Sequence, residues 1–71
     1  MTRTPVKSSQ IIAVGYDEST ETLEIEFVFA TYQYRNVPAR IHRELMAADS
    51  VGRYFANNIK SKPDAFPVKK L

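Results

Sequence analysis

The sequence contains no cysteine, and this absence excludes three classes of protein at once. Without thiols the chain cannot be a disulfide-stabilised scaffold, use a thiolate nucleophile or bind zinc through cysteine. Histidine is almost missing too, since His42 is the only one. No residue accompanies His42 at a spacing suited to catalysis or metal binding. We therefore expect no catalytic residue, no metal site and no cofactor.

Long apolar runs and glycine-rich loops are also missing. No segment approaches the roughly 18 apolar residues that cross a bilayer, and the polar N-terminus lacks the apolar core of a signal peptide. Gly15 and Gly52 are too isolated to form a phosphate-binding loop. Ser50 has no neighbouring base to activate it, so a helix N-cap is its expected role. We expect a cytoplasmic protein with no membrane partner.

What the chain does have is the composition of one small folded domain. It has 71 residues, of which 44% are hydrophobic and 25% charged, whereas a disordered chain would be less apolar and more highly charged. We expect the domain over residues 8–66, between a flexible N-terminal arm at 1–7 and a flexible basic tail at 67–71.

The net charge is only +2, but the charges are segregated along the chain. Residues 11–30 carry five acids and no base, whereas residues 31–62 carry six bases and two acids. The first part of the domain is therefore acidic and the second part basic, which favours an anionic partner for the second part.

Three segments have the pattern of β-strands, at residues 10–16, 22–29 and 32–37. In the second one, apolar and acidic residues alternate, which is typical of a half-buried strand. Leu23, Ile25, Phe27 and Phe29 should face the core. Glu24, Glu26 and Val28 should lie on the opposite face.

The pairing of the last two strands depends on the turn between them. A two-residue turn at Ala30-Thr31 would pair aromatic residues on the inner face and form an ion pair on the outer face. The predicted pairs are Phe29 with Tyr32, Phe27 with Tyr34, and Glu26 with Arg35. Ala-Thr lacks the positive φ preference of such turns, so a longer loop or a bulge would shift this register.

Two short helices are predicted after the strands, at residues 38–48 and 50–60. Pro38 suits the first turn of the first helix, and apolar residues then recur at helical spacing in both. The predicted fold class is therefore α+β: a three-stranded antiparallel β-meander followed by two short helices packed on one face of the sheet.

An ordered set of short motifs resembles the KTSC domain family, and it covers about residues 8–66. The motifs are Ser9-x-x-Ile12, Val14-Gly15-Tyr16-Asp17, Leu23-Glu24-Ile25-Glu26-Phe27, Tyr32-x-Tyr34, Val37-Pro38, Ala48-x-Ser50-x-Gly52-x-Tyr54-Phe55 and Ile59-Lys60. The chain departs from the family at Ala30-Thr31, where related sequences usually carry a glycine. The resemblance implies a short module, found alone in bacterial proteins and at the C-terminus of some lysyl-tRNA synthetases, with RNA binding suggested and no enzymatic activity.

Basic residues of the two helices form the candidate nucleic-acid-binding site. They are Arg40, Arg43, Arg53, Lys60 and Lys62. Together these side chains would offer a cationic surface to a phosphate backbone. The competing interpretation is that they are ordinary solvated helix faces.

Tyr32 and Tyr34 are open to two interpretations. Aromatic rings can stack on the bases of single-stranded nucleic acid. Their predicted position on the helix-covered face instead favours a place in the core or at its edge, with the hydroxyl groups reaching a polar partner.

A protein-interaction domain or homodimer is the alternative function. The segment at residues 11–14 is apolar on both faces, which a two-layer monomer does not require. RNA and a second copy of the chain are therefore the two candidate partners.

Overall fold

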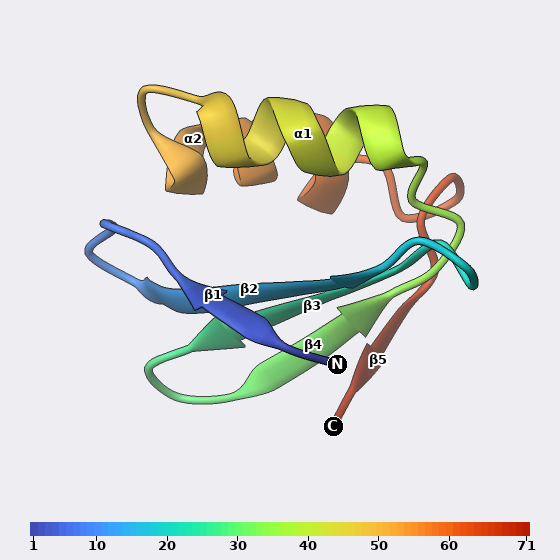
Figure 1. Cartoon of the computed structure of the whole chain (residues 1–71), viewed down its shortest axis with the longest axis horizontal. Helices are drawn as coiled ribbons and strands as arrows, with labels where there is room; N and C mark the ends of the chain where they lie inside the picture. The colour runs from blue at the N-terminus through green and yellow to red at the C-terminus, as the bar shows by residue number, and fades with distance from the viewer.

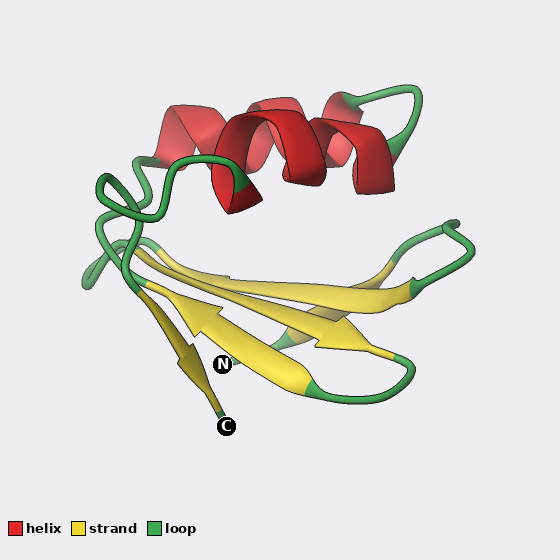
Figure 2. Ribbon diagram, turned by 180° about the vertical axis from the view of Figure 1, so that it is seen from behind, coloured by secondary structure: helices red, strands yellow, loops and turns green.

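The computed structural model describes all residues from 1 to 71, and they form two layers (Figures 1 and 2). One layer is a five-stranded antiparallel sheet in the order β1-β2-β3-β4-β5, and the other consists of helices on one face of it. The elements are β1 (Arg3–Pro5), β2 (Ile11–Asp17), β3 (Thr22–Phe27), β4 (Thr31–Tyr34), α1 (Ala39–Ala47), α2 (Val51–Phe55), η1 (Ala56–Lys60) and β5 (Val68–Lys70). No helix is long and apolar enough to span a membrane.

The predicted α+β class and the placement of both helices on one face are confirmed, but the predicted number of strands is wrong. The sheet has five strands rather than three, because the expected N-terminal arm and C-terminal tail each supply a three-residue edge strand. β1 pairs with β2, and β5 pairs with β4. Pro5 is compatible with β1 because an edge strand need not donate every N–H to a neighbour.

The predicted register between β3 and β4 is also wrong. Tyr34 lies opposite Leu23 rather than Phe27, and Tyr32 lies opposite Ile25. A loop over residues 28–30 replaces the two-residue turn and is closed by the backbone N–H of residue 27, which donates to the carbonyl of residue 30 at 2.8 Å. Ala30-Thr31 does not supply the positive φ of a tight turn, so the chain takes the longer loop.

This shift keeps the inner and outer faces as predicted, because the register moves by an even number of residues. Two individual contacts nevertheless change. Glu26 lies opposite Thr31, so the predicted pair with Arg35 does not form. Phe29 leaves the sheet for the loop and is 72% exposed, although the sequence predicted it beneath the helices.

The core lies between the helices and the inner face of the sheet. Its members are Ile11, Val14, Leu23, Ile25, Tyr34, Val37, Ile41, Leu45, Val51, Phe55, Ile59 and Phe66. Tyr16 ties the sheet to the start of α1, because its hydroxyl donates to the carbonyl of Val37. Burial of this apolar set is the main source of stability in the domain.

The predicted second helix is present, and its cap and apolar stripe are confirmed. The Ser50 hydroxyl accepts a hydrogen bond from the backbone N–H of Arg53 at 3.2 Å. Val51, Phe55 and Ile59 are the buried positions. The last five residues of the helix, which form η1, widen into a π-helical turn.

Candidate functional site

The largest hollow in the molecule is a groove of about 810 Å³. Its walls come from four segments: α2 and η1 with the joint that precedes them, the β1–β2 connection, the β3–β4 hairpin with its loop, and the segment around β5. Half of the 20 residues that line it are hydrophobic, and most of the others are polar or basic. Such a mixture of apolar and polar groups is typical of a ligand site.

A chain of aromatic rings runs through the groove from solvent to core. Phe29 stacks on Phe27, with ring centroids 5.4 Å apart and an interplanar angle of 19°. Phe27 meets Phe55 edge-on at 5.5 Å, and Phe55 meets Tyr34 edge-on at 5.4 Å. Tyr32 packs against the side of this chain, 5.7 Å from Phe27. The inner rings therefore support the exposed outer ring.

Three cations line the same groove: Lys7, Arg53 and Lys60. None of them forms an ion pair, since the three ion pairs of the molecule involve other bases. Asp49 is the only carboxylate among the lining residues, so three positive charges and one negative charge leave a net +2. Arg53 lies in α2 and Lys60 at the end of η1, so one continuous helical segment supplies two of the three cations. The groove therefore has an electropositive rim.

The structure does not bring all five predicted basic residues together. Arg53 and Lys60 line the groove, whereas Lys62 is exposed just beyond η1. Arg40 and Arg43 are exposed on α1 and do not line it. Arg40 also has a partner, because its guanidinium lies 3.3 Å from the carboxylate of Glu44.

The two candidate tyrosines occupy different environments. Tyr34 is only 7% exposed and belongs to the core, and its burial raises the pKa of its hydroxyl. Tyr32 is half-buried and lines the groove. The core interpretation therefore fits Tyr34, while Tyr32 lies where a ligand would contact it.

Sequence reasoning missed Lys7 and Phe29. Lys7 belonged to the expected flexible arm, and pairing of β1 with β2 now fixes the connection in which it lies. Phe29 was expected in the core, and the only signal against this was the unfavourable two-residue turn.

His42 has a structural role. Its ring stacks on Tyr16 with centroids 4.5 Å apart and an interplanar angle of 11°. Partial burial, with the charge of Arg43 nearby, lowers the pKa of His42. No group of three or more histidine, aspartate or glutamate side chains is placed to hold a metal ion.

A polar contact joins the two helices away from the groove. The Tyr54 hydroxyl donates to the Glu44 carboxylate at 2.7 Å. Burial and the neighbouring carboxylate raise the pKa of Tyr54 to about 12, and the same hydrogen bond lowers the pKa of Glu44. The contact helps to fix the angle at which α2 leaves α1.

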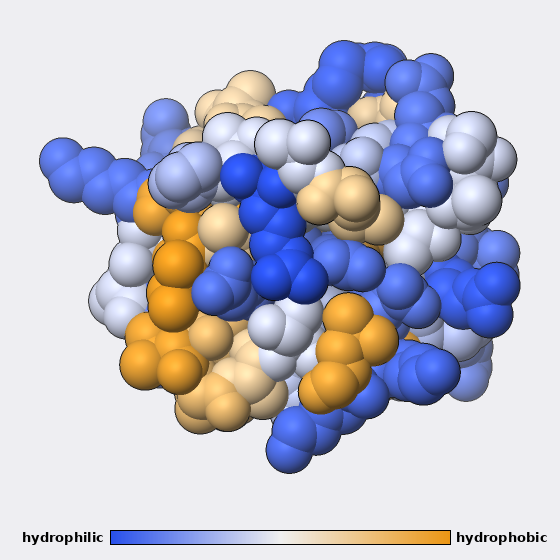
Figure 3. All heavy atoms as spheres, turned by 60° about the horizontal axis from the view of Figure 1, so that its bottom comes forward, coloured by the Kyte–Doolittle hydropathy of each residue, from blue (hydrophilic) through white to orange (hydrophobic).

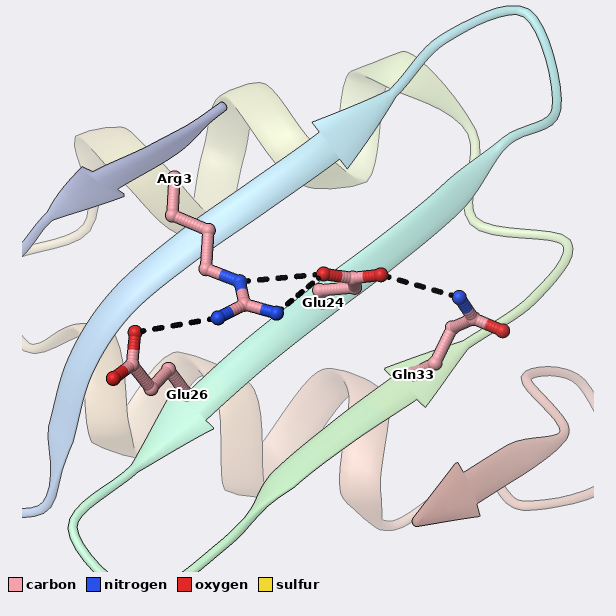
Figure 4. A network of polar contacts seen from close by, with 4 residues as sticks. All are labelled: Arg3, Glu24, Glu26 and Gln33. Atoms are coloured by element: carbon pink, nitrogen blue, oxygen red, sulfur yellow. Dashed lines mark hydrogen bonds and ion pairs between the residues drawn. The ribbon is translucent and has the colours of Figure 1, made fainter. Parts of the chain in front are cut away.

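The outer face of the sheet carries a closed polar network (Figure 4). Arg3 contacts Glu24 at 2.8 Å and Glu26 at 3.6 Å, and the Gln33 amide donates to Glu24 at 3.2 Å. The hydrogen bond from Arg3 is the main cause that lowers the pKa of Glu24. Arg3 can lie flat on the sheet because it faces Gly15, where a side chain would come within 3.0 Å of the arginine.

Comparison with known proteins gives a consistent family. A model of the KTSC domain matches residues 7–62. A protein of Tsukamurella paurometabola is 41% identical over 59 residues, covering 82% of this chain and 88% of that one. An uncharacterised protein of Stutzerimonas stutzeri is 41% identical over 56 residues, covering 78% and 79%. The crystal structure of the KTSC domain protein YPO2434 of Yersinia pestis is similar, with a TM-score of 0.91, 45% identity, and coverage of 99% of this chain and 96% of that one.

Proposed function

We propose that this chain, which belongs to the KTSC domain family, is a non-enzymatic module that binds nucleic acid through its cationic groove. The observation that carries the proposal is the set of three unpaired cations, Lys7, Arg53 and Lys60, around one groove. Unpaired cations on one groove give it a positive potential, which attracts an anionic ligand, and binding releases the counterions condensed on the phosphates of that ligand. The choice of RNA rests on the family resemblance alone.

The other large surface of the sheet is a poor alternative for the same ligand. Glu24 and Glu26 lie on the outer face, and their carboxylates would repel phosphates. The one arginine there, Arg3, is already engaged by both of them. This charge distribution favours binding on the helix side of the sheet.

Salt dependence of binding tests the proposal. About three phosphate contacts to a single strand should give a slope of log K against log salt near −2, from roughly −0.7 per contact. Fluorescence anisotropy with a labelled RNA of about 10 nucleotides, at several salt concentrations, measures it. The double variant Arg53→Gln with Lys60→Gln should flatten the slope by about 1.4.

Arg40→Gln is the matched control, because Arg40 is also an exposed helix arginine but lies outside the groove. It should leave the slope close to that of the unaltered chain. An absence of binding to single-stranded RNA, single-stranded DNA and duplex RNA at low salt would refute the proposal. If Arg40→Gln flattens the salt slope as much as Arg53→Gln with Lys60→Gln does, the binding site does not lie in the groove.

Homodimerisation is the second candidate, and two exposed apolar residues favour it. Ile12 is 45% exposed and Val28 is 70% exposed. Val28 lies next to the start of β2, since its backbone N–H donates to the carbonyl of Gln10 at 3.2 Å, and Ile12 is the second residue of that strand. Figure 3, which looks onto the side of the sheet away from the helices, shows apolar surface along one margin of a polar face. Size-exclusion chromatography with light scattering tests this candidate, and a dimer that Ile12→Ser dissociates would support it.

A further inference from the structure

The β3–β4 loop presents an aromatic ring to solvent at the mouth of the cationic groove. Phe29 is 72% exposed, more than any other large hydrophobic residue of the chain. Exposure of a phenylalanine ring forgoes the stabilisation that its burial would give. The ring lines the groove and is not part of the core.

The ring is supported from beneath. Phe27 lies nearly parallel to it at 5.4 Å, and Phe27 is in turn held by edge contacts with Phe55 and Tyr32 at 5.5 and 5.7 Å. One side of Phe29 is thus backed by a stack that continues into the core.

The loop itself is tied at two points. The backbone N–H of Phe27 donates to the carbonyl of Ala30 at 2.8 Å, and that of Val28 donates to the carbonyl of Gln10 at 3.2 Å. The second bond joins the loop to the start of β2. A ring held in this way loses little conformational freedom when a ligand covers it, which favours affinity.

We infer that Phe29 is a stacking platform for an unpaired base, so that the groove binds single-stranded nucleic acid in preference to duplex. This inference rests on the proposed function and specifies its ligand. Phe29 supplies the flat apolar surface, and the cations Lys7, Arg53 and Lys60 on the same groove attract the flanking phosphates. Aromatic platforms combined with a cationic groove are the means by which proteins bind single strands.

A duplex does not suit this arrangement. Its bases are paired and stacked on one another, so it offers phosphates and sugars to the outside and leaves an aromatic platform without a partner. The net charge of +2 on the groove also disfavours an apolar segment of a second protein copy as the occupant, since such a segment would desolvate the cations without pairing them.

The experiment compares Phe29→Ala with Phe29→Tyr, which keeps the aromatic ring. Phe29→Ala should weaken binding of a single-stranded RNA about tenfold, since each stacked base contributes roughly 1–3 kcal/mol. It should leave the salt slope unchanged, because no phosphate contact is lost. Phe29→Tyr should bind like the unaltered chain. Val28→Ala is the matched control, because Val28 is also exposed in the loop but does not line the groove.

A fluorescent base analogue in the RNA gives a second measurement. The fluorescence of 2-aminopurine should change on binding to the unaltered chain and to Phe29→Tyr, and the change should be smaller with Phe29→Ala. Single-stranded RNA and single-stranded DNA should both bind more tightly than duplex RNA at the same salt concentration.

The outcomes separate this inference from the proposed function. If Phe29→Ala binds RNA normally while Arg53→Gln with Lys60→Gln flattens the salt slope, the platform is wrong and the nucleic-acid function stands. If duplex binds as tightly as single strands, the platform is also wrong. If the unaltered chain binds no nucleic acid, both fail. A concentration-dependent dimer that Phe29→Ala abolishes would assign the ring to a protein contact instead.

Discussion

The two faces of the sheet use the same kinds of charged residue in opposite ways. On the outer face, Arg3 lies between Glu24 and Glu26, so every charge in the cluster has a partner. On the helix side, Arg53 and Lys60 line a groove and have no ion pair. Paired charges on the outer face hold β1 onto the sheet, whereas unpaired charges on the groove leave their electric field available to a ligand.

Aromatic residues divide within the groove in a similar way. Tyr34 at the inner end belongs to the core, and Phe29 at the outer end faces solvent. The rings between them connect the two environments. Distance from the core, and not residue type, therefore separates the aromatics that hold the fold from the one exposed to solvent.

The largest predicted effect is a difference in stability between a variant at the inner end of the groove, Tyr34→Ala, and one at the outer end, Phe29→Ala. Tyr34→Ala should lower the free energy of unfolding by about 3–5 kcal/mol, because it leaves a cavity beside Phe55. Phe29→Ala should change it by no more than about 0.5 kcal/mol, as exposed substitutions do. Equilibrium urea unfolding measures both values. Similar losses of stability for the two variants would show that Phe29 also belongs to the core.

An intermediate effect is expected at the wall of the groove. Ser50→Ala removes the hydroxyl that accepts from the N–H of Arg53, and loss of such a cap costs about 1 kcal/mol. Ser61→Ala is the control, because Ser61 is an exposed serine after η1 whose hydroxyl donates to the carbonyl of Asn57 and caps no helix start. Urea unfolding should rank Ser50→Ala clearly below Ser61→Ala in stability, and the reverse order would contradict the assigned cap.

The sequence alone predicted the elements in which apolar residues recur at a regular spacing. The alternation around Leu23 and Ile25 predicted β3, and the stripe of Val51, Phe55 and Ile59 predicted the second helix. These patterns are local, so residues along one segment determine them.

The edge strands and the register were beyond such local patterns. β1 and β5 have three residues each and all of them are exposed, so neither can show a periodic apolar face. They form because β2 and β4 offer unpaired backbone groups at the edges of the sheet. The register followed from the conformation of a loop, and the residues of that loop do not specify one turn type.

The candidate site was predictable only in part for the same reason. Arg53 and Lys60 belong to the predicted second helix, so the sequence alone predicted that one helical segment carries both. Lys7 and Phe29 join them through the pairing of β1 and through the β3–β4 loop, which are tertiary features. The groove is built from four separate segments, and no single stretch of sequence contains it.

The smallest predicted effect concerns the outer face and depends on pH. The pKa of Glu24 lies below its ordinary value of 4.5, chiefly because Arg3 donates a hydrogen bond to it. A carboxyl whose pKa is lowered by folding stabilises the folded state above the ordinary pKa, and this contribution is lost as the pH falls through the lowered value. The urea midpoint should therefore decrease as the pH falls below 4.5, the ordinary value for the carboxyl of Glu24.

Glu24→Gln should remove part of that decrease, since a glutamine has no charge to lose. Asp17 and Glu44 also have lowered pKa values, from hydrogen bonds to Ser19 and Tyr54, so some pH dependence should remain. Arg3→Gln removes the other partner of the same contact. The stability lost in the double variant should therefore be smaller than the sum of the losses in Arg3→Gln and Glu24→Gln. Glu18→Gln is the control, because Glu18 is exposed and has no part in the Arg3 network. Urea midpoints of all four variants, at neutral pH and below pH 4.5, test the assignment. If the urea midpoints of Glu24→Gln and Glu18→Gln decrease equally on acidification, the charge of Glu24 contributes nothing to the stability of the fold. The paired charges of the outer face would then have no role in folding to set against the unpaired charges of the groove.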